Sequence, residues 1–258
     1  NVDNVGYSTY TTAPGLDEGA LKISGASVGT KQGFSIIKYV GNATQPTTVP
    51  HGLNSALDFM IVKNLTTANN WAVFHKDLID GGTVRYLRLN TTDGRVTGSG
   101  HFGNTAPTDT VFTLGSDDQV NKLNNDFIAY CWHSVPGFSK FGKWTNNNSN
   151  DGAFIELGFK PAVILLTDYD GGENWYLVDS ERHKFNIAAP SNDGANAIRT
   201  LQPNSANNEA TADNAHPNTT IDFLSNGFKI RTTNAASGEI SFGTRNYIYA
   251  AWAEAPSV

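Results

Sequence analysis

Short runs of β-branched and aromatic residues, each bounded by Gly, Asn, Asp or Pro, recur along all 258 residues of the chain. No segment keeps apolar residues at i, i+3, i+4 and i+7 for the length of an ordinary helix between a cap and a stop. Runs of this kind predict strands. They are 34–40, 57–62, 71–74, 84–89, 111–114, 127–132, 153–157, 162–166, 175–178, 221–224, 228–231, 239–242 and 247–252. We therefore expect an all-β protein in which helix is a minor component.

The pattern inside the runs predicts how the strands are buried. Polar and apolar residues alternate in 86–89, 228–231 and 239–242, which is typical of antiparallel strands with one wet face. The runs 57–62 and 162–166 are nearly continuously apolar, which suits central strands covered on both faces. Together these patterns favour antiparallel sheets packed face to face as β-sandwiches.

The second half of the chain repeats the order of landmarks in the first half, at a separation of about 105 residues. Gly33-Phe34-Ser35 returns as Gly137-Phe138-Ser139, and Asn70-Trp71 returns as Asn174-Trp175. The closing run 127–136 aligns without gaps to 247–256. We therefore predict two similar β units from an internal duplication, either as two separate sandwiches or packed together as one pseudo-symmetric body.

The repeat divides the chain into three parts. Residues 33–136 form the first unit and residues 137–258 form the second, with residues 1–32 as a leader or linker strand segment. The closing landmarks are further apart than the earlier ones, so the second unit carries an insertion near 188–220. This stretch is rich in Asn, Ala, Ser and Pro and predicts a long surface loop.

Charge and composition exclude several classes of partner. The chain has 18 Lys and Arg against 24 Asp and Glu, without a basic cluster to neutralise phosphates, so nucleic acid is not an expected partner. Its longest apolar runs fall well short of the roughly 20 residues that span a bilayer, so we expect no membrane insertion. Its one cysteine, Cys131, excludes a disulfide scaffold and a thiolate-rich zinc site. No cofactor is expected.

Several segments resemble an uncharacterised duplicated β domain of tailed-bacteriophage virion structural and tail fibre proteins, those of cyanophages included. The resemblance lies in 33–42, 49–53, 59–64, 104–115, 129–133, 137–142, 221–231 and 247–254, and so extends over nearly everything after residue 32. It implies a structural or adhesive role on the virion exterior, outside the cell. It supplies no catalytic residues for this chain.

One acidic loop is a candidate for chemistry. Asp168, Asp170 and Glu173 lie within six residues around a Gly pair, which is how a calcium loop gathers oxygen ligands. The same pattern is also typical of an ordinary hairpin loop, and the matching stretch 64–69 of the first unit has no carboxylate. A glycosidase carboxylate pair could alternatively be drawn from Asp168, Asp170, Asp179 or Glu181.

Other motifs favour structural readings. Gly25-Ala26-Ser27-Val28-Gly29 has the letters of a nucleophile elbow, but the sequence after it predicts a turn and a strand in place of the required helix. His75-Lys76-Asp77 lacks the spacing of a phosphodiesterase motif. The histidines follow no metal-ligand spacing and are interpreted as scattered surface or turn residues: His51, His75, His101, His133, His183 and His216.

The tryptophans divide into two groups. Trp71, Trp132, Trp175 and Trp252 recur at matched positions of the two units inside predicted strands, so we expect them in the core. Trp144 has no matching tryptophan, because Tyr39 or Val40 stands opposite it. It is therefore the aromatic residue with a case for ligand binding, for example by stacking on a sugar.

We therefore hypothesise a non-enzymatic exterior virion module of a tailed phage, of the tail fibre or adhesin type, that touches the host surface through loops. Its expected partners are a host glycan and either other virion proteins or copies of itself, with a homotrimer as the expected oligomer. The alternatives are a carbohydrate-binding or glycan-degrading β-sandwich protein and a purely architectural decoration of a capsid or filament. No catalytic or metal-binding residue is assigned.

Overall fold

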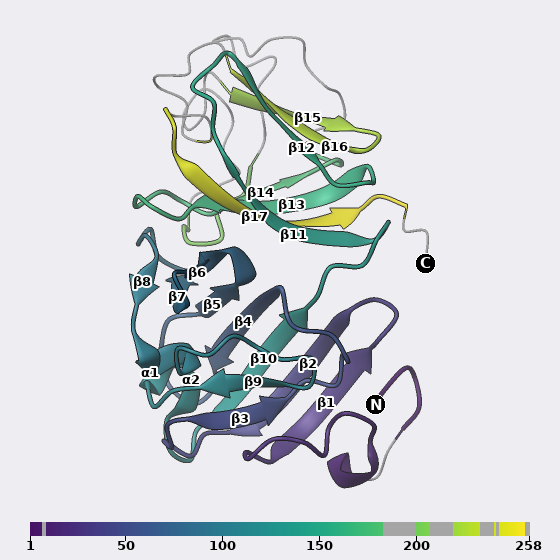
Figure 1. Cartoon of the computed structure of the whole chain (residues 1–258), viewed down its shortest axis with the longest axis vertical. Coiled ribbons are helices and arrows are strands. Elements are labelled where there is room, and N and C mark those ends of the chain that lie inside the picture. The colour runs from purple at the N-terminus through teal and green to yellow at the C-terminus, as the bar shows by residue number, and fades with distance from the viewer. Residues whose placement is uncertain (7–8, 183–199, 207–218, 233–239, 241–242, 256–258) are drawn as a thin grey trace. The chain divides into compact units, whose positions relative to one another are not determined.

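The computed structural model describes residues 1–6, 9–182, 200–206, 219–232, 240 and 243–255. The chain divides into two compact units, drawn in Figure 1. Unit 1 comprises Asn1–Leu89 and Arg95–Val135, and unit 2 comprises Asn90–Gly94 and Pro136–Val258. The main boundary therefore falls between Val135 and Pro136, one residue before the predicted junction.

Unit 1 is built on an eight-stranded antiparallel sheet. The strand order is β1-β2-β10-β4-β5-β7-β6, and β8 pairs with β7. The bounds are β1 Ile23–Gly29, β2 Phe34–Val40, β4 Phe59–Asn64, β5 Ala72–His75, β6 Ile79–Asp80, β7 Thr83–Arg88, β8 Val96–Thr97 and β10 Asp126–Trp132. Short helices connect some of these strands: the 3-10 helices η1 Tyr10–Thr12 and η2 Lys76–Leu78, and the α-helices α1 Ser99–Phe102 and α2 Asp118–Asn121. The prediction of an all-β protein is confirmed.

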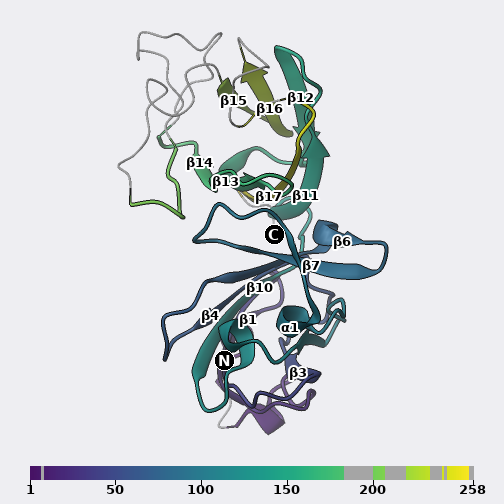
Figure 2. The same ribbon diagram turned by 90° about the vertical axis from the view of Figure 1, so that its left-hand side faces the viewer.

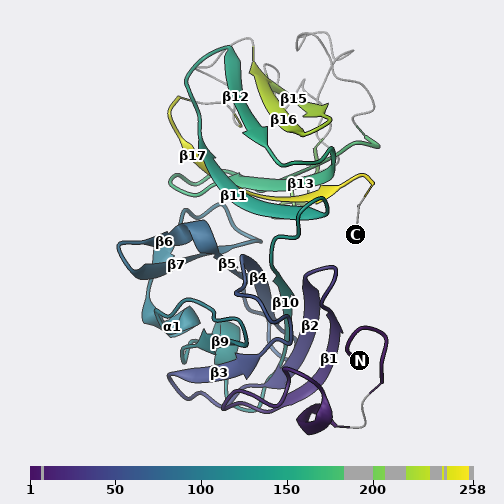
Figure 3. The ribbon, with the colours of Figure 1, turned by 45° about the vertical axis from the view of Figure 1, so that its right-hand side comes forward.

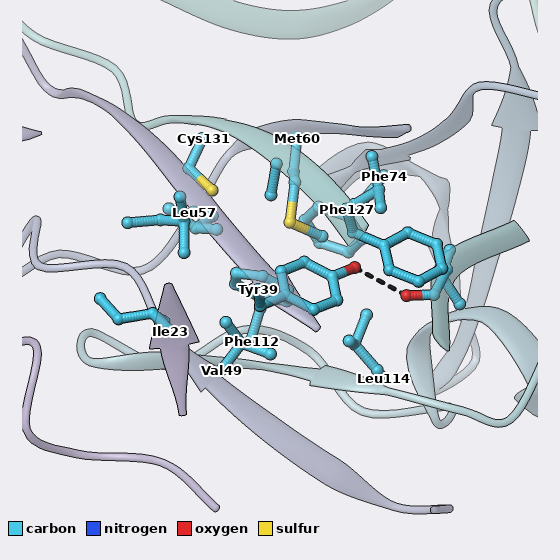
Figure 4. Close-up of a cluster of buried hydrophobic side chains, with 14 of the residues drawn as sticks. Ile23, Tyr39, Val49, Leu57, Met60, Phe74, Phe112, Leu114, Phe127 and Cys131 are labelled. Carbon is cyan, nitrogen blue, oxygen red and sulfur yellow. Dashed lines mark hydrogen bonds between the residues drawn. The ribbon is translucent and has the colours of Figure 1, made fainter. Parts of the chain in front are cut away.

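A second, two-stranded sheet covers one face of the large sheet in unit 1 (Figure 3). It pairs β3, Thr47–Pro50, with β9, Val111–Leu114. The hydrophobic core lies between the two sheets, where the Tyr39 ring stacks on Phe127 and meets Phe112 edge to face. Figure 4 shows these buried side chains and the Tyr39 hydroxyl, which donates a 2.7 Å hydrogen bond to the Val120 carbonyl oxygen.

Unit 2 is also a pair of antiparallel sheets, seen from the side in Figure 2. One sheet has the order β11-β17-β13-β14 and the other has the order β12-β16-β15. Their facing side chains, among them Ile164, Tyr249, Phe228 and Ile230, form one hydrophobic cluster. The bounds are β11 Ser139–Thr145, β12 Asp151–Glu156, β13 Pro161–Asp168, β14 Tyr176–Asp179, β15 Thr219–Leu224, β16 Gly227–Thr232 and β17 Asn246–Ala253.

Four neighbouring strands have the same order in the two units. In unit 1 they are β2-β10-β4-β5, and in unit 2 they are β11-β17-β13-β14. In each unit the last strand along the chain lies between the first strand and the next two. The pairing agrees in detail, because Met60 lies opposite Cys131 in unit 1 while Ile164 lies opposite Ala251 in unit 2. The segments that aligned in sequence therefore occupy equivalent positions in their sheets.

Two predicted segments are placed only in part. Residues 1–32 belong to unit 1, where β1 pairs with β2 as an edge strand of the large sheet. Of the predicted insertion, 188–199 and 207–218 lie outside the described residues, as does most of the predicted strand 239–242. In the described part of the chain, no helix has the length and apolar character needed to cross a membrane.

Candidate functional site

The acidic loop follows β13, and its three carboxylates gather around cationic and amide groups next to β17. The Arg245 guanidinium forms ion pairs with Asp168, at 3.3 Å, and with Glu173. The Asn246 amide donates a 2.7 Å hydrogen bond to Asp170. Among the described residues, no group of three or more His, Cys, Asp and Glu side chains is placed to hold a metal ion. The loop is thus held by an arginine of its own unit.

Asp168 is the buried member of this loop, with 1% of its surface exposed. Burial raises the pKa of its carboxyl group, while the Asp170 backbone N–H and the Arg245 charge act in the opposite direction. Its Oδ1 accepts a 2.8 Å hydrogen bond from that N–H, and among the described residues its Oδ2 interacts with Arg245 through the ion pair. Asp168 therefore orders the turn, and Arg245 compensates its charge.

The four carboxylates considered for a glycosidase pair do not converge. Asp179 lies opposite Val163, at the start of β13, whereas Asp168 is the last residue of that strand. Five residues of extended strand separate the two positions by about 17 Å. Asp179 accepts a 2.8 Å hydrogen bond from the Arg182 backbone N–H, and Glu181 is exposed in the same turn. The structure thus brings Asp168 and Asp170 together but places Asp179 and Glu181 at the other end of the hairpin.

Trp144 is a core residue, and its predicted role in ligand binding is corrected. Its side chain is 8% exposed and its ring stacks on Tyr247 at 4.7 Å between centroids. The physical reason lies in the register, because Trp144 pairs with Tyr247 on β17 as Tyr39 pairs with Phe127 on β10. Tyr39 is therefore its structural counterpart, and both rings fill the space between two sheets.

The other tryptophans differ in burial. Trp175 is buried, with 2% of its surface exposed, whereas Trp71, Trp132 and Trp252 are half-buried. Trp132 stacks on Phe34 at 4.9 Å between ring centroids. The prediction of a core position is therefore confirmed for Trp175, whereas the other three tryptophans are only partly buried.

The remaining motifs have structural positions. Ser27 lies in the middle of β1 opposite Ile36, and the chain passes from β1 through a turn into β2, without the helix of a nucleophile elbow. His75 caps η2 by accepting a 3.1 Å hydrogen bond from the Asp77 N–H, and Lys76 forms an ion pair with Asp58 at 3.1 Å.

The interpretation of the histidines as scattered surface or turn residues was wrong on burial for three of them. His51, His75 and His101 have at most 2% of their surface exposed. Turn backbone groups satisfy the His51 ring, since Nδ1 accepts from the Leu53 N–H and Nε2 lies 3.2 Å from the Thr108 carbonyl oxygen. Burial lowers the pKa of His51 to about 4 and also lowers that of His101. His183 and His216 lie outside the described residues.

The outer face of the three-stranded sheet in unit 2 combines an exposed aromatic ring with charged groups. Phe154 on β12, Lys229 on β16 and Asp222 on β15 lie directly opposite one another. Residues opposite each other on neighbouring strands point to the same face. Because Phe228 and Ile230 on β16 belong to the core, the alternate residues Lys229 and Arg231 face away from it. We name the set Phe154, Asp222, Lys229 and Arg231 the sheet-face cluster.

Sequence reasoning missed the sheet-face cluster. The run 153–157 was predicted as a strand, but it contains Phe154 and Ile155 side by side, so its pattern did not show which of the two side chains is exposed. The alternation of 228–231 did place Lys229 and Arg231 on a wet face. The position of Phe154 beside these two residues depends on the pairing of β12 with β16. The spacing of residues in the sequence does not predict that pairing.

The described part of the insertion is attached to β14. The Leu177 and Leu201 backbones exchange two hydrogen bonds, of 2.8 and 3.0 Å. The Asn204 side chain accepts a 2.9 Å hydrogen bond from the Trp175 N–H and donates one of 2.7 Å to Asn174. The polar stretch therefore has a fixed point on the sheet at residues 200–206.

These observations define the class of protein: an all-β chain of two sheet-pair units whose second unit carries a polar insertion and a sheet face with an exposed aromatic ring. The chain belongs to the family described as "Domain of unknown function (DUF7483)", whose model matches residues 14–256. Searches of curated proteins and of solved structures found no match.

Proposed function

We propose that the chain is a non-enzymatic structural module on the exterior of a tailed-phage virion, of the tail fibre or adhesin type, which contacts the host surface through unit 2. The observation that carries the proposal is the attachment of residues 200–206 to β14, because a long polar segment fixed to a rigid sheet is a common way to present a binding surface. The sequence resemblance to virion proteins points in the same direction.

The polar groups of unit 2 support a non-enzymatic role. In the acidic loop, Asp168, Asp170 and Glu173 already bind Arg245 or Asn246. A catalytic carboxylate pair has to flank a bound substrate at a defined separation. We therefore propose that the loop stabilises the fold, and that the module acts by binding.

The common strand order supports a further part of the proposal, that the two units arose by internal duplication. The pairs Met60–Cys131 and Ile164–Ala251 are equivalent in both sheets and in the sequence repeat. We also propose that copies of the chain associate with one another or with other virion proteins, as a trimer in the case of a fibre.

An adsorption experiment tests this function. Purified chain is added to host cells before the phage that encodes it, and the rate of phage adsorption is measured. The proposal predicts that the chain slows adsorption in a concentration-dependent way and that antibodies against it label intact particles. Labelled particles with unchanged adsorption would favour a purely architectural decoration, and unlabelled particles would overturn the proposal.

A further inference from the structure

The sheet-face cluster has a feature that the fold itself does not require. Phe154 has 46% of its surface exposed and is the only aromatic residue among the strongly exposed large hydrophobics of the described chain; the others are Val5, Val40, Leu65 and Leu123. Burying an aromatic ring is strongly favourable, and its flat face packs well against other flat apolar surfaces. The ring therefore offers a stacking surface on an open strand position.

Polar groups beside the ring are held in fixed positions. The Arg231 Nε donates a 2.8 Å hydrogen bond to Asp222, and its Nη1 donates one of 3.1 Å to Asp151. The Lys229 ammonium group lies 2.9 Å from the Gly152 carbonyl oxygen and 3.0 Å from Asp151. These contacts fix two cationic donors on the same face as the ring. Because these side chains are already ordered, the entropic cost of binding a ligand is lower.

The carboxylate of Asp222 helps to orient Arg231. Its side chain is 10% exposed, and its Oδ2 accepts the 2.8 Å hydrogen bond from the Arg231 Nε. Asp222 lies two strand spacings from Phe154, or about 9.5 Å, a distance that a short oligosaccharide spans.

The chemistry of this face favours one class of ligand. It offers a flat apolar ring, two cationic donors and the three carboxylates of Asp151, Glu156 and Asp222, so both signs of charge are present and the net charge is −1. A strongly charged polymer would meet both signs of charge. A sugar ring presents a C–H face for stacking, and its hydroxyl groups both donate and accept hydrogen bonds.

We propose that the outer face of β12, β16 and β15 is a glycan-binding site in which Phe154 stacks on a sugar ring. Arg231 and Lys229 donate hydrogen bonds to ring or hydroxyl oxygens, and Asp222 holds the Arg231 guanidinium in position. This inference deepens the proposed function and rests on it only for the source of the glycan, the host surface. The binding itself is a property of unit 2.

Binding of the full chain to immobilised oligosaccharides tests the site. The probes are tetrasaccharides and longer chains of glucose, galactose, mannose, N-acetylglucosamine and sialic acid, and affinity is measured by interferometry. We expect Phe154→Ala and Phe154→Leu to weaken binding by about tenfold, because both remove the ring. Phe154→Tyr keeps the ring and should bind like the unchanged chain. The matched control Leu65→Ala removes an exposed apolar side chain of unit 1 and should also leave binding unchanged.

Two results would overturn the inference. Either the unchanged chain binds none of the probes, or Phe154→Leu binds them as tightly as the unchanged chain, which would show that the Phe154 ring does not stack on the sugar. Thermal melting of each variant shows whether a loss of binding reflects unfolding. Glycan binding by a chain that is absent from particles would contradict the proposed function alone, and labelled particles without glycan binding would contradict this inference alone.

Discussion

Two aromatic side chains, Trp144 and Phe154, show that burial separates a core residue from a candidate binding residue. Trp144 was assigned to a binding surface because it had no matching tryptophan, yet its structural counterpart Tyr39 is also a large aromatic core residue. Phe154 shows the opposite case, because a residue inside an apolar run is exposed. Residue type therefore did not predict which ring is exposed, because the side on which each ring lies depends on the register between strands.

The His51 imidazole makes the stability of unit 1 dependent on pH. Its pKa is lowered from 6.5 to about 4, so the folded protein binds this proton later than the unfolded chain does as the pH falls. The stability contributed by neutral His51 is present above pH 6.5 and is lost as the pH falls towards 4. The expected loss is about 3 kcal/mol. In neutral His51, Nδ1 accepts a hydrogen bond from the Leu53 backbone N–H. Protonation would place a hydrogen on Nδ1, so this hydrogen bond would be lost and two N–H groups would face each other.

Urea unfolding at a series of pH values measures this contribution. His51→Gln retains one donor and one acceptor but does not titrate, so the slope of unfolding free energy against pH between 6.5 and 4 should be smaller in the variant. Identical slopes in the two proteins would show that His51 is not the group responsible.

The buried hydroxyl group of Tyr39 should contribute measurably to stability. Tyr39→Phe removes its hydrogen bond to Val120 and leaves that carbonyl oxygen without this donor. The expected loss is about 1–2 kcal/mol of unfolding free energy. Tyr130→Phe is the matched control, because Tyr130 is a half-buried tyrosine of β10 and should change stability by less than about 0.5 kcal/mol. Equal losses in both variants would refute this role of the hydroxyl group.

At the scale of elements, the sequence predicted the strands that stand out as runs of large apolar residues and missed several that do not. The runs 34–40, 127–132 and 221–224 correspond to β2, β10 and β15. The missed strand β1 has three glycines or serines among its interior residues, and β3 ends in Pro50. In β11, apolar residues stand at positions 141 and 144, which breaks the period of two. These strands form because neighbouring strands supply hydrogen bonds and packing.

The pairing of β12 with β16 depends on a glycine. A Cβ at Gly227 would lie 2.1 Å from the Ile155 carbonyl oxygen, which is a backbone atom that cannot turn aside. Gly227→Ala should therefore lower the unfolding free energy by about 2 kcal/mol or more and weaken any ligand binding at the sheet-face cluster. Gly98→Ala is the control, since a Cβ there meets no atom within 4 Å. Thermal melting compares the two, and an unaffected Gly227→Ala would mean that the strands are further apart than described.

The attachment of residues 200–206 to β14 should depend on Asn204. Asn204→Ala removes the acceptor of the Trp175 N–H and the donor to Asn174. Opening of this segment then costs less, so limited proteolysis within 200–206 should become several times faster. In Gln202→Ala the backbone contacts of the segment are kept, and the cleavage rate should stay as it is. Equal rates in the two variants would contradict the role of Asn204.

For the whole molecule, composition and the recurring strand-like runs predicted an all-β chain, which the structure confirms. The candidate binding face could not be predicted, because it is assembled from β12 and from the hairpin of β15 and β16, which lie about 70 residues apart in the chain. The acidic loop was visible in the sequence, but its compensation by Arg245 was not, since that residue precedes a different strand.

The position of the chain on a particle tests the central claim most directly. Cys131 is fully buried and burial raises the pKa of its thiol, so a cysteine introduced at an exposed position by Ala206→Cys can be labelled selectively with maleimide-coated gold. Electron microscopy of phage particles that carry this variant then locates the label. Label at a tail or fibre tip is the predicted result. Label spread over the capsid would contradict host contact, and particles without label would contradict the virion role itself.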